Sequence, residues 1–199
     1  MAQEAVDLYR QLTAGRADTF NSDLASSLND LSCRLSDLDY CERAFEVIQE
    51  AVDLYRQLAA DRADVFNHYL ARSLNNLSGR LLDLDHCEHA LKVIQEAVDL
   101  YRKLAADRPE AFNSDLASSL NNLSHCLSDL GHRERALEVI QEAVDLRRQL
   151  ATDRPGVFNL VFASSLDKLS RQLTNLGHRE QALEALQEAA IICSQPTAV

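Results

Sequence analysis

The chain has 199 residues, of which 46% are hydrophobic, and carries a formal net charge of −11 at pH 7. Binding to nucleic acids or to anionic membranes depends on clustered basic residues, so this acidic balance argues against both kinds of partner. No stretch approaches the roughly 20 apolar residues of a membrane-spanning helix, and no secretory signal is visible, which predicts a cytoplasmic protein.

One segment recurs along the whole chain. The sequence Gln-Glu-Ala-Val-Asp-Leu begins at residues 3, 49, 95 and 141, and a weaker copy begins at Gln187. Each copy starts 46 residues after the one before it, and a fixed period of this size is typical of stacked supersecondary units. We therefore expect one repeat array over residues 1–199 and not a single globular core.

Each unit is expected to hold two helices, which we call helix A and helix B. The chain opens with an orphan helix B over residues 3–14, and repeats follow at about 22–61, 68–107, 114–153 and 160–194. Helix A is expected at residues 22–38, 68–84, 114–130 and 160–176. Helix B is expected at residues 41–61, 87–107, 133–153 and 179–194, which gives nine helices.

The third repeat shows why two helices are expected. Leucines spaced by three or four residues form one apolar stripe on helix A: Leu116, Leu120, Leu123, Leu127 and Leu130. This helix begins with Asn113 or Ser114 as its cap and ends at Gly131, because glycine tolerates the left-handed backbone of a tight turn. The equivalents of Gly131 are Asp39, Asp85 and Gly177. Helix B stops before Arg154-Pro155, since proline disfavours helix in the residue ahead of it.

Each connection from helix B to the next helix A is expected to carry a phenylalanine. The four positions are Phe20, Phe66, Phe112 and Phe158. An aromatic side chain at a fixed place in every connection is explained best as an anchor that fills the seam between repeats. Stacking on a ligand is the alternative.

Small residues decide which helical repeat this is. The third repeat places Leu123-Ser124 on helix A, Gly131 at the turn, and Ala136, Ile140 and Ala143 on helix B. This pattern resembles the tetratricopeptide repeat, and the longer form with Leu-Asn-Asn-Leu looks like the repeats of kinesin light chains and of NLR-type signalling ATPases. Two features depart from the usual motif: leucine takes the Trp-like position of helix A, and helix B lacks its closing proline.

The resemblance implies an all-α, right-handed solenoid whose helices A line a concave groove. It further implies a scaffold or sensor module that binds a protein or peptide ligand in that groove, without catalysis and without a cofactor. A rival interpretation is a structural unit whose purpose is self-assembly.

Paired asparagines in the middle of helix A are the strongest candidates for ligand contacts. Asparagine is a poor helix former, and its amide offers both donors and an acceptor to an extended peptide backbone. The pairs are Asn75-Asn76 and Asn121-Asn122, and the outer repeats hold Asn29-Asp30 and Asp167-Lys168 instead. The alternative is structural, since a mid-helix asparagine can also bond a neighbouring helix and fix the stacking.

Helix A varies most just after these asparagines. Cys33, Gly79, His125 and Arg171 are equivalent, as are Arg34, Arg80, Cys126 and Gln172. We expect Arg80 and His125 to contribute selectivity, with drift on a solvated face as the alternative. Asp83 and Asp129 belong to an acidic row that would favour basic ligands if it faced the groove, or would be a solvated edge.

No catalytic or metal-binding set stands out. His86, His132 and His178 repeat beside the turn, but residues one repeat apart lie too far from each other to share a metal ion. A residue that recurs in every repeat is explained better by packing than by catalysis. The five cysteines form no Cys-x-x-Cys pair, so we expect reduced thiols.

The last helix is unusually apolar for the end of an array. Ile191 stands where Asp145 stands one repeat earlier, Ile192 follows it, and the chain begins halfway through a repeat. Either the chain is a piece of a longer array, or its ends contact another domain or another copy. We expect homo-oligomer formation through Ile191 and Ile192, because exposed apolar surface usually marks a contact.

Overall fold

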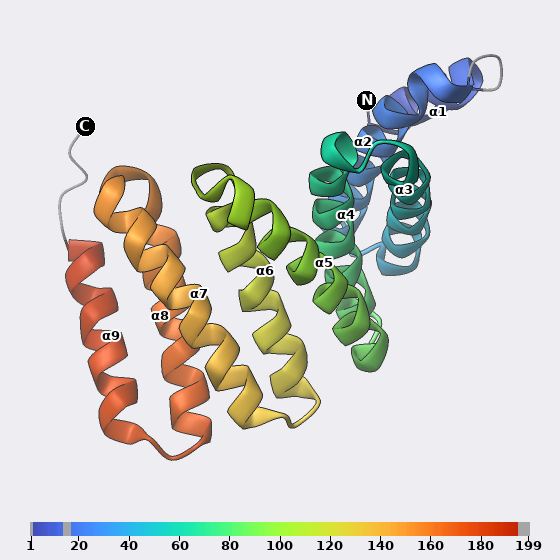
Figure 1. The fold of residues 1–199 in the computed structure, drawn as a ribbon. Helices are drawn as coiled ribbons and strands as arrows, with labels where there is room; N and C mark the ends of the chain where they lie inside the picture. The colour runs from blue at the N-terminus through green and yellow to red at the C-terminus, as the bar shows by residue number, and fades with distance from the viewer. Residues whose placement is uncertain (1, 14–16, 195–199) are drawn as a thin grey trace. The chain divides into compact units, whose positions relative to one another are not determined.

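A computed structural model of the chain describes residues 2–13 and 17–194. These residues form nine α-helices and no strand (Figure 1). Helices B are α1 (Ala2–Thr13), α3 (Cys41–Asp61), α5 (Cys87–Asp107), α7 (Arg133–Asp153) and α9 (Arg179–Ser194). Helices A are α2 (Ala17–Ser36), α4 (Ala63–Asp83), α6 (Pro109–Asp129) and α8 (Pro155–Asn175). The predicted all-α architecture is confirmed.

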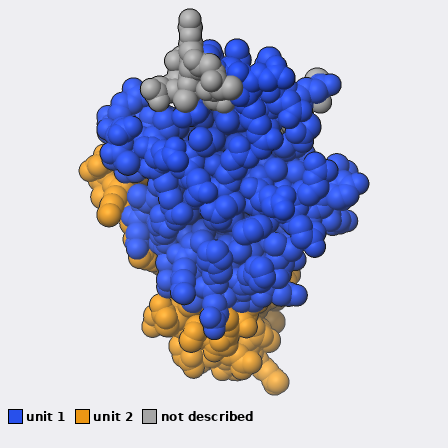
Figure 2. All heavy atoms as spheres, turned by 90° about the vertical axis from the view of Figure 1, so that its right-hand side faces the viewer, with its two compact units in different colours: residues 1–100 blue, residues 101–199 orange. Residues whose placement is uncertain are grey.

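The chain divides into two compact units, residues 1–100 and 101–199, and the boundary falls within α5 (Figure 2). In unit 1, α2 packs against α1, α3 and α4. In unit 2, α6 packs on α7 and α8, and α8 packs on α7 and α9, so these four helices lie side by side (Figure 1). Each inner helix therefore buries its apolar stripe on the helices next to it, as a repeat array requires.

The core of each unit consists of the apolar positions that define the repeat. Leucines of helix A and isoleucines of helix B are almost fully buried: Leu28, Ile48, Leu74, Leu120, Ile140 and Leu166. The alanines Ala44, Ala51, Ala136 and Ala143 are 0% exposed, because their small side chains let the antiparallel helices approach closely. Within the described residues, no helix is long and apolar enough to cross a membrane.

The turn from helix A to helix B is confirmed as left-handed. Asp85 has φ of 60° and Gly131 has φ of 79°, and Asp39 and Gly177 match them. In the second repeat the Asp85 amide donates to the Leu82 carbonyl at 2.9 Å, and the His86 amide donates to the Leu81 carbonyl at 2.8 Å. This pair of bonds is a Schellman motif, which satisfies the last carbonyls of α4.

A buried serine ties helix A to helix B above each of two turns. Ser32 Oγ donates to the Ala44 carbonyl at 2.8 Å, and Ser124 Oγ donates to the Ala136 carbonyl at the same distance. The serine hydroxyls thus hold the first turn of helix B against helix A. This explains serine at the place where the repeat motif usually has glycine or alanine.

Helix A begins five residues earlier than predicted, so the capping role expected of Asn113 or Ser114 is wrong. A single residue separates helix B from the next helix A: Arg62, Arg108 or Arg154, each with φ near −140°. Pro109 and Pro155 do end the preceding helix, but each also starts the next one. Proline suits a first helical position because its missing N–H would have no partner there.

The phenylalanines therefore lie in the first turn of helix A and not in a connection. Phe66, Phe112 and Phe158 are buried, and the guanidinium of the arginine four residues earlier lies about 5 Å from each ring centroid. This cation–π contact closes the junction between repeats. The anchor role predicted for these rings agrees with their burial, although their predicted location was wrong.

Candidate functional site

In unit 1 the paired polar residues of helix A connect one helix A to the next. Asn29 on α2 is 3% exposed, and its Nδ2 donates to Ser73 Oγ on α4 at 2.8 Å. Asn76 Nδ2 donates back to Asn29 Oδ1 at 3.1 Å, and Asn76 and Asn75 are both half-buried. The amide of Asn29 is therefore used in packing between the helices.

Unit 2 repeats this connection between α6 and α8. Asn121 is 5% exposed, and its Nδ2 donates to Ser165 Oγ at 3.1 Å. Asn122 is half-buried beside it. Asn29 and Asn121 thus have the partners that the structural alternative requires, because a buried amide needs a partner inside the protein. A ligand contact by either residue stays a prediction. Asn75, Asn76 and Asn122 keep more accessible side chains.

A pocket of about 350 Å³ lies between α6 and α8, and we call it the α6–α8 pocket. Helix α6 contributes its asparagine pair with Ser124 and His125, α7 contributes Ile140, and α8 contributes Lys168, Arg171 and Gln172. His125 and Asn122, two of the residues predicted to contact a ligand, therefore line the same pocket as Lys168. In the sequence, Lys168 was noted only because it replaces the second asparagine of the pair. All of these residues belong to unit 2.

Positive charge collects at this pocket. Lys168 is exposed, but partial desolvation, followed by the charges of Arg147 and Arg171, lowers the pKa of its ammonium group. Asp167 opposes this effect and pairs with Arg171 at 2.9 Å. His125 Nε2 lies 3.6 Å from Asp129, so two carboxylates stand beside the basic groups.

Arg147 on α7 was not predicted as a functional residue from the sequence. Its guanidinium donates to the Val161 carbonyl at 2.8 Å and to Ser118 Oγ at 3.0 Å. The side chain is 8% exposed, and among the described residues no carboxylate pairs with it and its Nε lacks a hydrogen-bond partner. Burial lowers the pKa of this guanidinium. The sequence does mark this position, because the equivalent residues of three other B helices are all tyrosines: Tyr9, Tyr55 and Tyr101.

The tyrosine at this place in unit 1 lies in an aromatic cluster. The rings of Tyr55 and Tyr69 stack with centroids 5.5 Å apart, and the Arg72 guanidinium lies 5.5 Å from the Tyr69 centroid. Burial raises the pKa of the Tyr55 phenol, and the positive charge of Arg72 partly offsets this effect. The same position of helix B therefore holds a neutral ring in α3 and a cation in α7.

The other predicted selectivity residues are paired along their own helices. Arg80 Nε lies 3.3 Å from Asp83 on α4, as His125 lies near Asp129 on α6. Asp83 also accepts a weak hydrogen bond from Ser36 at 3.5 Å. The acidic row is exposed, but its charge is partly balanced by these neighbours.

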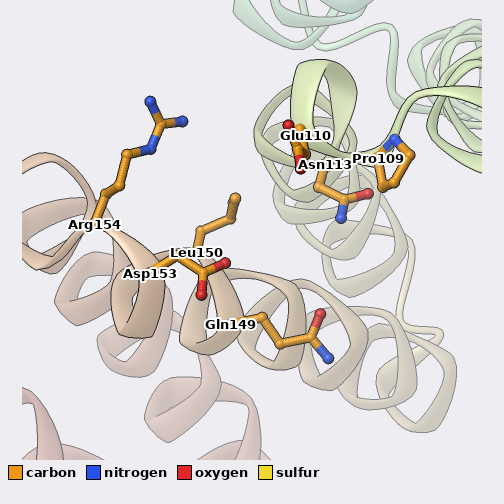
Figure 3. Close-up of a pocket in the computed structure, with 7 residues that line it drawn as sticks. All are labelled: Pro109, Glu110, Asn113, Gln149, Leu150, Asp153 and Arg154. Carbon is orange, nitrogen blue, oxygen red and sulfur yellow. The ribbon is translucent and has the colours of Figure 1, made fainter.

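A larger hollow of about 740 Å³ lies at the start of α6 and the end of α7 (Figure 3). Glu110 and Asn113 line it from α6, and Gln149 and Asp153 line it from α7. Its lining side chains are exposed or half-buried except for Leu150, and its charges are mixed. The α6–α8 pocket differs, because its lining includes Lys168 and Arg171 and no carboxylate.

Helix α9 exposes an apolar face. Leu183 is 59% exposed, Leu186 43% and Ile191 61%, whereas Ile192 is half-buried. Ile140, the equivalent of Leu186 one repeat earlier, is 0% exposed. Of the two residues predicted for self-association, Ile191 is the accessible one. Among the described residues, no group of three or more His, Cys, Asp or Glu side chains is arranged to hold a metal ion.

A comparison with protein-family models assigns the repeat. The tetratricopeptide repeat model matches residues 24–61, 70–110 and 116–151, which is more than half of the chain. The chain belongs to the tetratricopeptide-repeat family. A model for anaphase-promoting complex subunit 5 matches residues 158–196 only. No curated protein sequence matches the tetratricopeptide-repeat chain.

Solved structures agree with the tetratricopeptide-repeat fold. The kinesin-light-chain-like repeats of Podosopora anserina share 19% identity with the chain at a TM-score of 0.66, covering 100% of this chain and 90% of theirs. MamA shares 15% identity at a TM-score of 0.62, with 96% and 88% covered. A Rap protein in complex with competence and sporulation factor shares 17% identity at a TM-score of 0.70, with 95% and 49% covered. At these identities the likeness establishes the fold alone.

Proposed function

We propose that this tetratricopeptide-repeat chain is a non-catalytic scaffold that binds a protein or peptide ligand on its helix-A surface. The α6–α8 pocket is the observation that carries the proposal. It combines half-buried amides with charged side chains, and polar groups of this kind can fix the orientation of a bound ligand. The Rap protein solved with competence and sporulation factor gives an example of a ligand complex on this fold.

The proposed ligand contacts are the accessible polar residues of helix A. In unit 2 these are Asn122 and His125, with Gln172 beside them. In unit 1 we propose Asn75, Asn76 and Arg80 for the same role. All five cysteines lie in the described part of the chain and none of them forms a disulfide, which suits a reducing compartment. We propose that the chain acts in the cytoplasm.

Selection from a random peptide library on the immobilised chain tests the proposal. We expect selected peptides to bind the chain in solution and to bind the His125→Ala variant several-fold more weakly, by titration calorimetry. The His125 side chain is 65% exposed, so the free energy of unfolding should change by less than about 0.5 kcal/mol.

Glu138→Ala on the exposed surface of α7 is the matched control, and its affinity should equal that of the unmodified chain. Selected peptides that bind His125→Ala and the unmodified chain equally would place the ligand elsewhere. Failure to enrich any peptide would count against peptide binding altogether.

Self-association through α9 is a second candidate function, favoured by its exposed Leu183, Leu186 and Ile191. We expect the molar mass from light scattering to rise above that of the monomer with concentration. Ile191→Asp, which installs the residue type of Asp145 one repeat earlier, should reduce this rise. A monomer mass from micromolar to millimolar concentration would rule out the candidate.

A further inference from the structure

The hollow at the start of α6 and the end of α7 is lined by two carboxylates, those of Glu110 and Asp153, and we call it the α6–α7 hollow (Figure 3). Its volume is about 740 Å³, against about 350 Å³ for the α6–α8 pocket. Its other polar lining consists of the amides of Asn113 and Gln149 and the guanidinium of Arg154. The hollow shares no lining residue with the α6–α8 pocket, so the proposed ligand site does not account for it.

Neither carboxylate has a partner within the described part of the chain. The side chains of Glu110 and Asp153 form no hydrogen bond and no ion pair there. Arg154 is the one cation among the seven lining residues, and its guanidinium lies 5.1 Å from the centroid of the Phe158 ring. Two negative charges and one positive charge therefore leave the α6–α7 hollow with a negative balance.

The position of Asp153 is a second observation. Asp153 is the last residue of α7, where a carboxylate lies beside the negative end of the helix dipole. The last turn of α7 holds no basic residue that would compensate for this charge. Glu110 is placed favourably, because it lies in the first turn of α6, beside the positive end of that dipole. A cation bound in the hollow would offset the unfavourable charge at Asp153.

We infer that the α6–α7 hollow binds a lysine or arginine side chain from a basic segment of a partner protein. Ammonium and guanidinium groups form charge-assisted hydrogen bonds with carboxylates, which are stronger than neutral ones. Asn113 and Gln149 offer amide oxygens to the remaining N–H donors. Leu150, the buried residue of the lining, offers apolar surface to the alkyl stem of such a side chain. The net charge of −11 favours the approach of a basic partner at long range.

A pair of end-blocked synthetic peptides tests the inference, one alternating Lys and Ala and the other alternating Gln and Ala. By titration calorimetry we expect the chain to bind the Lys peptide and not the Gln peptide. The double variant Glu110→Gln with Asp153→Asn should bind the Lys peptide about fivefold more weakly, because both carboxylates of the hollow are removed. Failure of the unmodified chain to bind the Lys peptide would overturn the inference.

A matched double variant controls for general attraction between a basic peptide and an acidic chain. Glu138→Gln with Glu184→Gln removes the same two charges from exposed positions of α7 and α9. Because salt screens the interactions of distant exposed charges, its affinity for the Lys peptide should stay within about twofold of that of the unmodified chain. Equal losses of affinity in the two double variants would also overturn the inference.

NMR locates the bound peptide independently of the substitutions. Addition of the Lys peptide should shift the side-chain amide signals of Asn113 and Gln149 and leave that of Asn122 unchanged. A shift at Asn122 alone would place the basic peptide in the α6–α8 pocket. That result would overturn the α6–α7 hollow as the site and leave the proposed peptide-binding function in place.

Asp153→Asn by itself separates a role in binding from a role in the fold. We expect the melting temperature of the free chain to rise by about 1–2 °C, because the C-terminal end of α7 no longer carries a carboxylate. A fall of several degrees would show that Asp153 stabilises the free chain. It would contradict the unfavourable charge on which the inference depends.

Discussion

Ile140→Ala should lower the free energy of unfolding by about 3 kcal/mol, because it removes a fully buried side chain and leaves a cavity. Ile140 lies on α7, is 0% exposed and lines the α6–α8 pocket. The measurement is urea denaturation followed by circular dichroism. In a repeat array the loss can be confined to neighbouring repeats, so the transition should broaden as well as shift.

Leu186→Ala is the matched control, since Leu186 occupies the same position one repeat later. Leu186 is 43% exposed and buries less apolar surface than Ile140. Leu186→Ala should therefore lower the free energy of unfolding by only about 1 kcal/mol. Equal losses at the two positions would contradict the packing described for unit 2. They would indicate that another surface covers α9 in solution, which would favour self-association.

Asn121→Ala should lower the free energy of unfolding by about 2 kcal/mol, because the substitution leaves the Ser165 hydroxyl without its partner. Ser165 is 0% exposed and lies 3.1 Å from the Asn121 amide, so water cannot easily replace the lost bond. A double-mutant cycle with Ser165→Ala should give a coupling energy of about 1 kcal/mol.

Asn175→Ala provides the comparison for this experiment, since Asn175 is exposed at the last position of α8. Its free energy of unfolding should change by less than about 0.5 kcal/mol. If Asn121→Ala instead left stability unchanged and abolished binding of the selected peptides, the structural role assigned to Asn121 would be wrong. The ligand-contact role first considered for it would then be restored.

The helix-A asparagines show how far a candidate site can be predicted from sequence. Their position within the helix was predictable, because the apolar stripe fixes the register. Their separate roles were not, since adjacent residues point about 100° apart around a helix. The first amide of the pair turns toward the next helix A and donates a hydrogen bond to a serine there. This serine lies 44 residues further along the chain for both Asn29 and Asn121.

For a similar reason Arg147 was not predicted from the sequence, and Lys168 was interpreted only as a loss of the asparagine pair. In the sequence, each is a residue that differs from its equivalents in the other repeats. Such a difference cannot be assigned a role until the neighbouring residues in the structure are known. Lys168 lines a pocket together with residues of α6, and Arg147 donates to a carbonyl and a hydroxyl of other helices. The starts of helix A were predicted too late because a single arginine suffices as the connection.

The sequence by itself determined the helical class, the pairing of helices within each repeat and the left-handed turns at Asp39, Asp85, Gly131 and Gly177. These depend on local spacing and on backbone preferences, which act over a few residues. Only the tertiary structure decided which polar side chains are buried between helices and which line the α6–α8 pocket. Those outcomes depend on contacts between residues more than 40 positions apart, and no local pattern encodes the direction from which a neighbouring helix approaches.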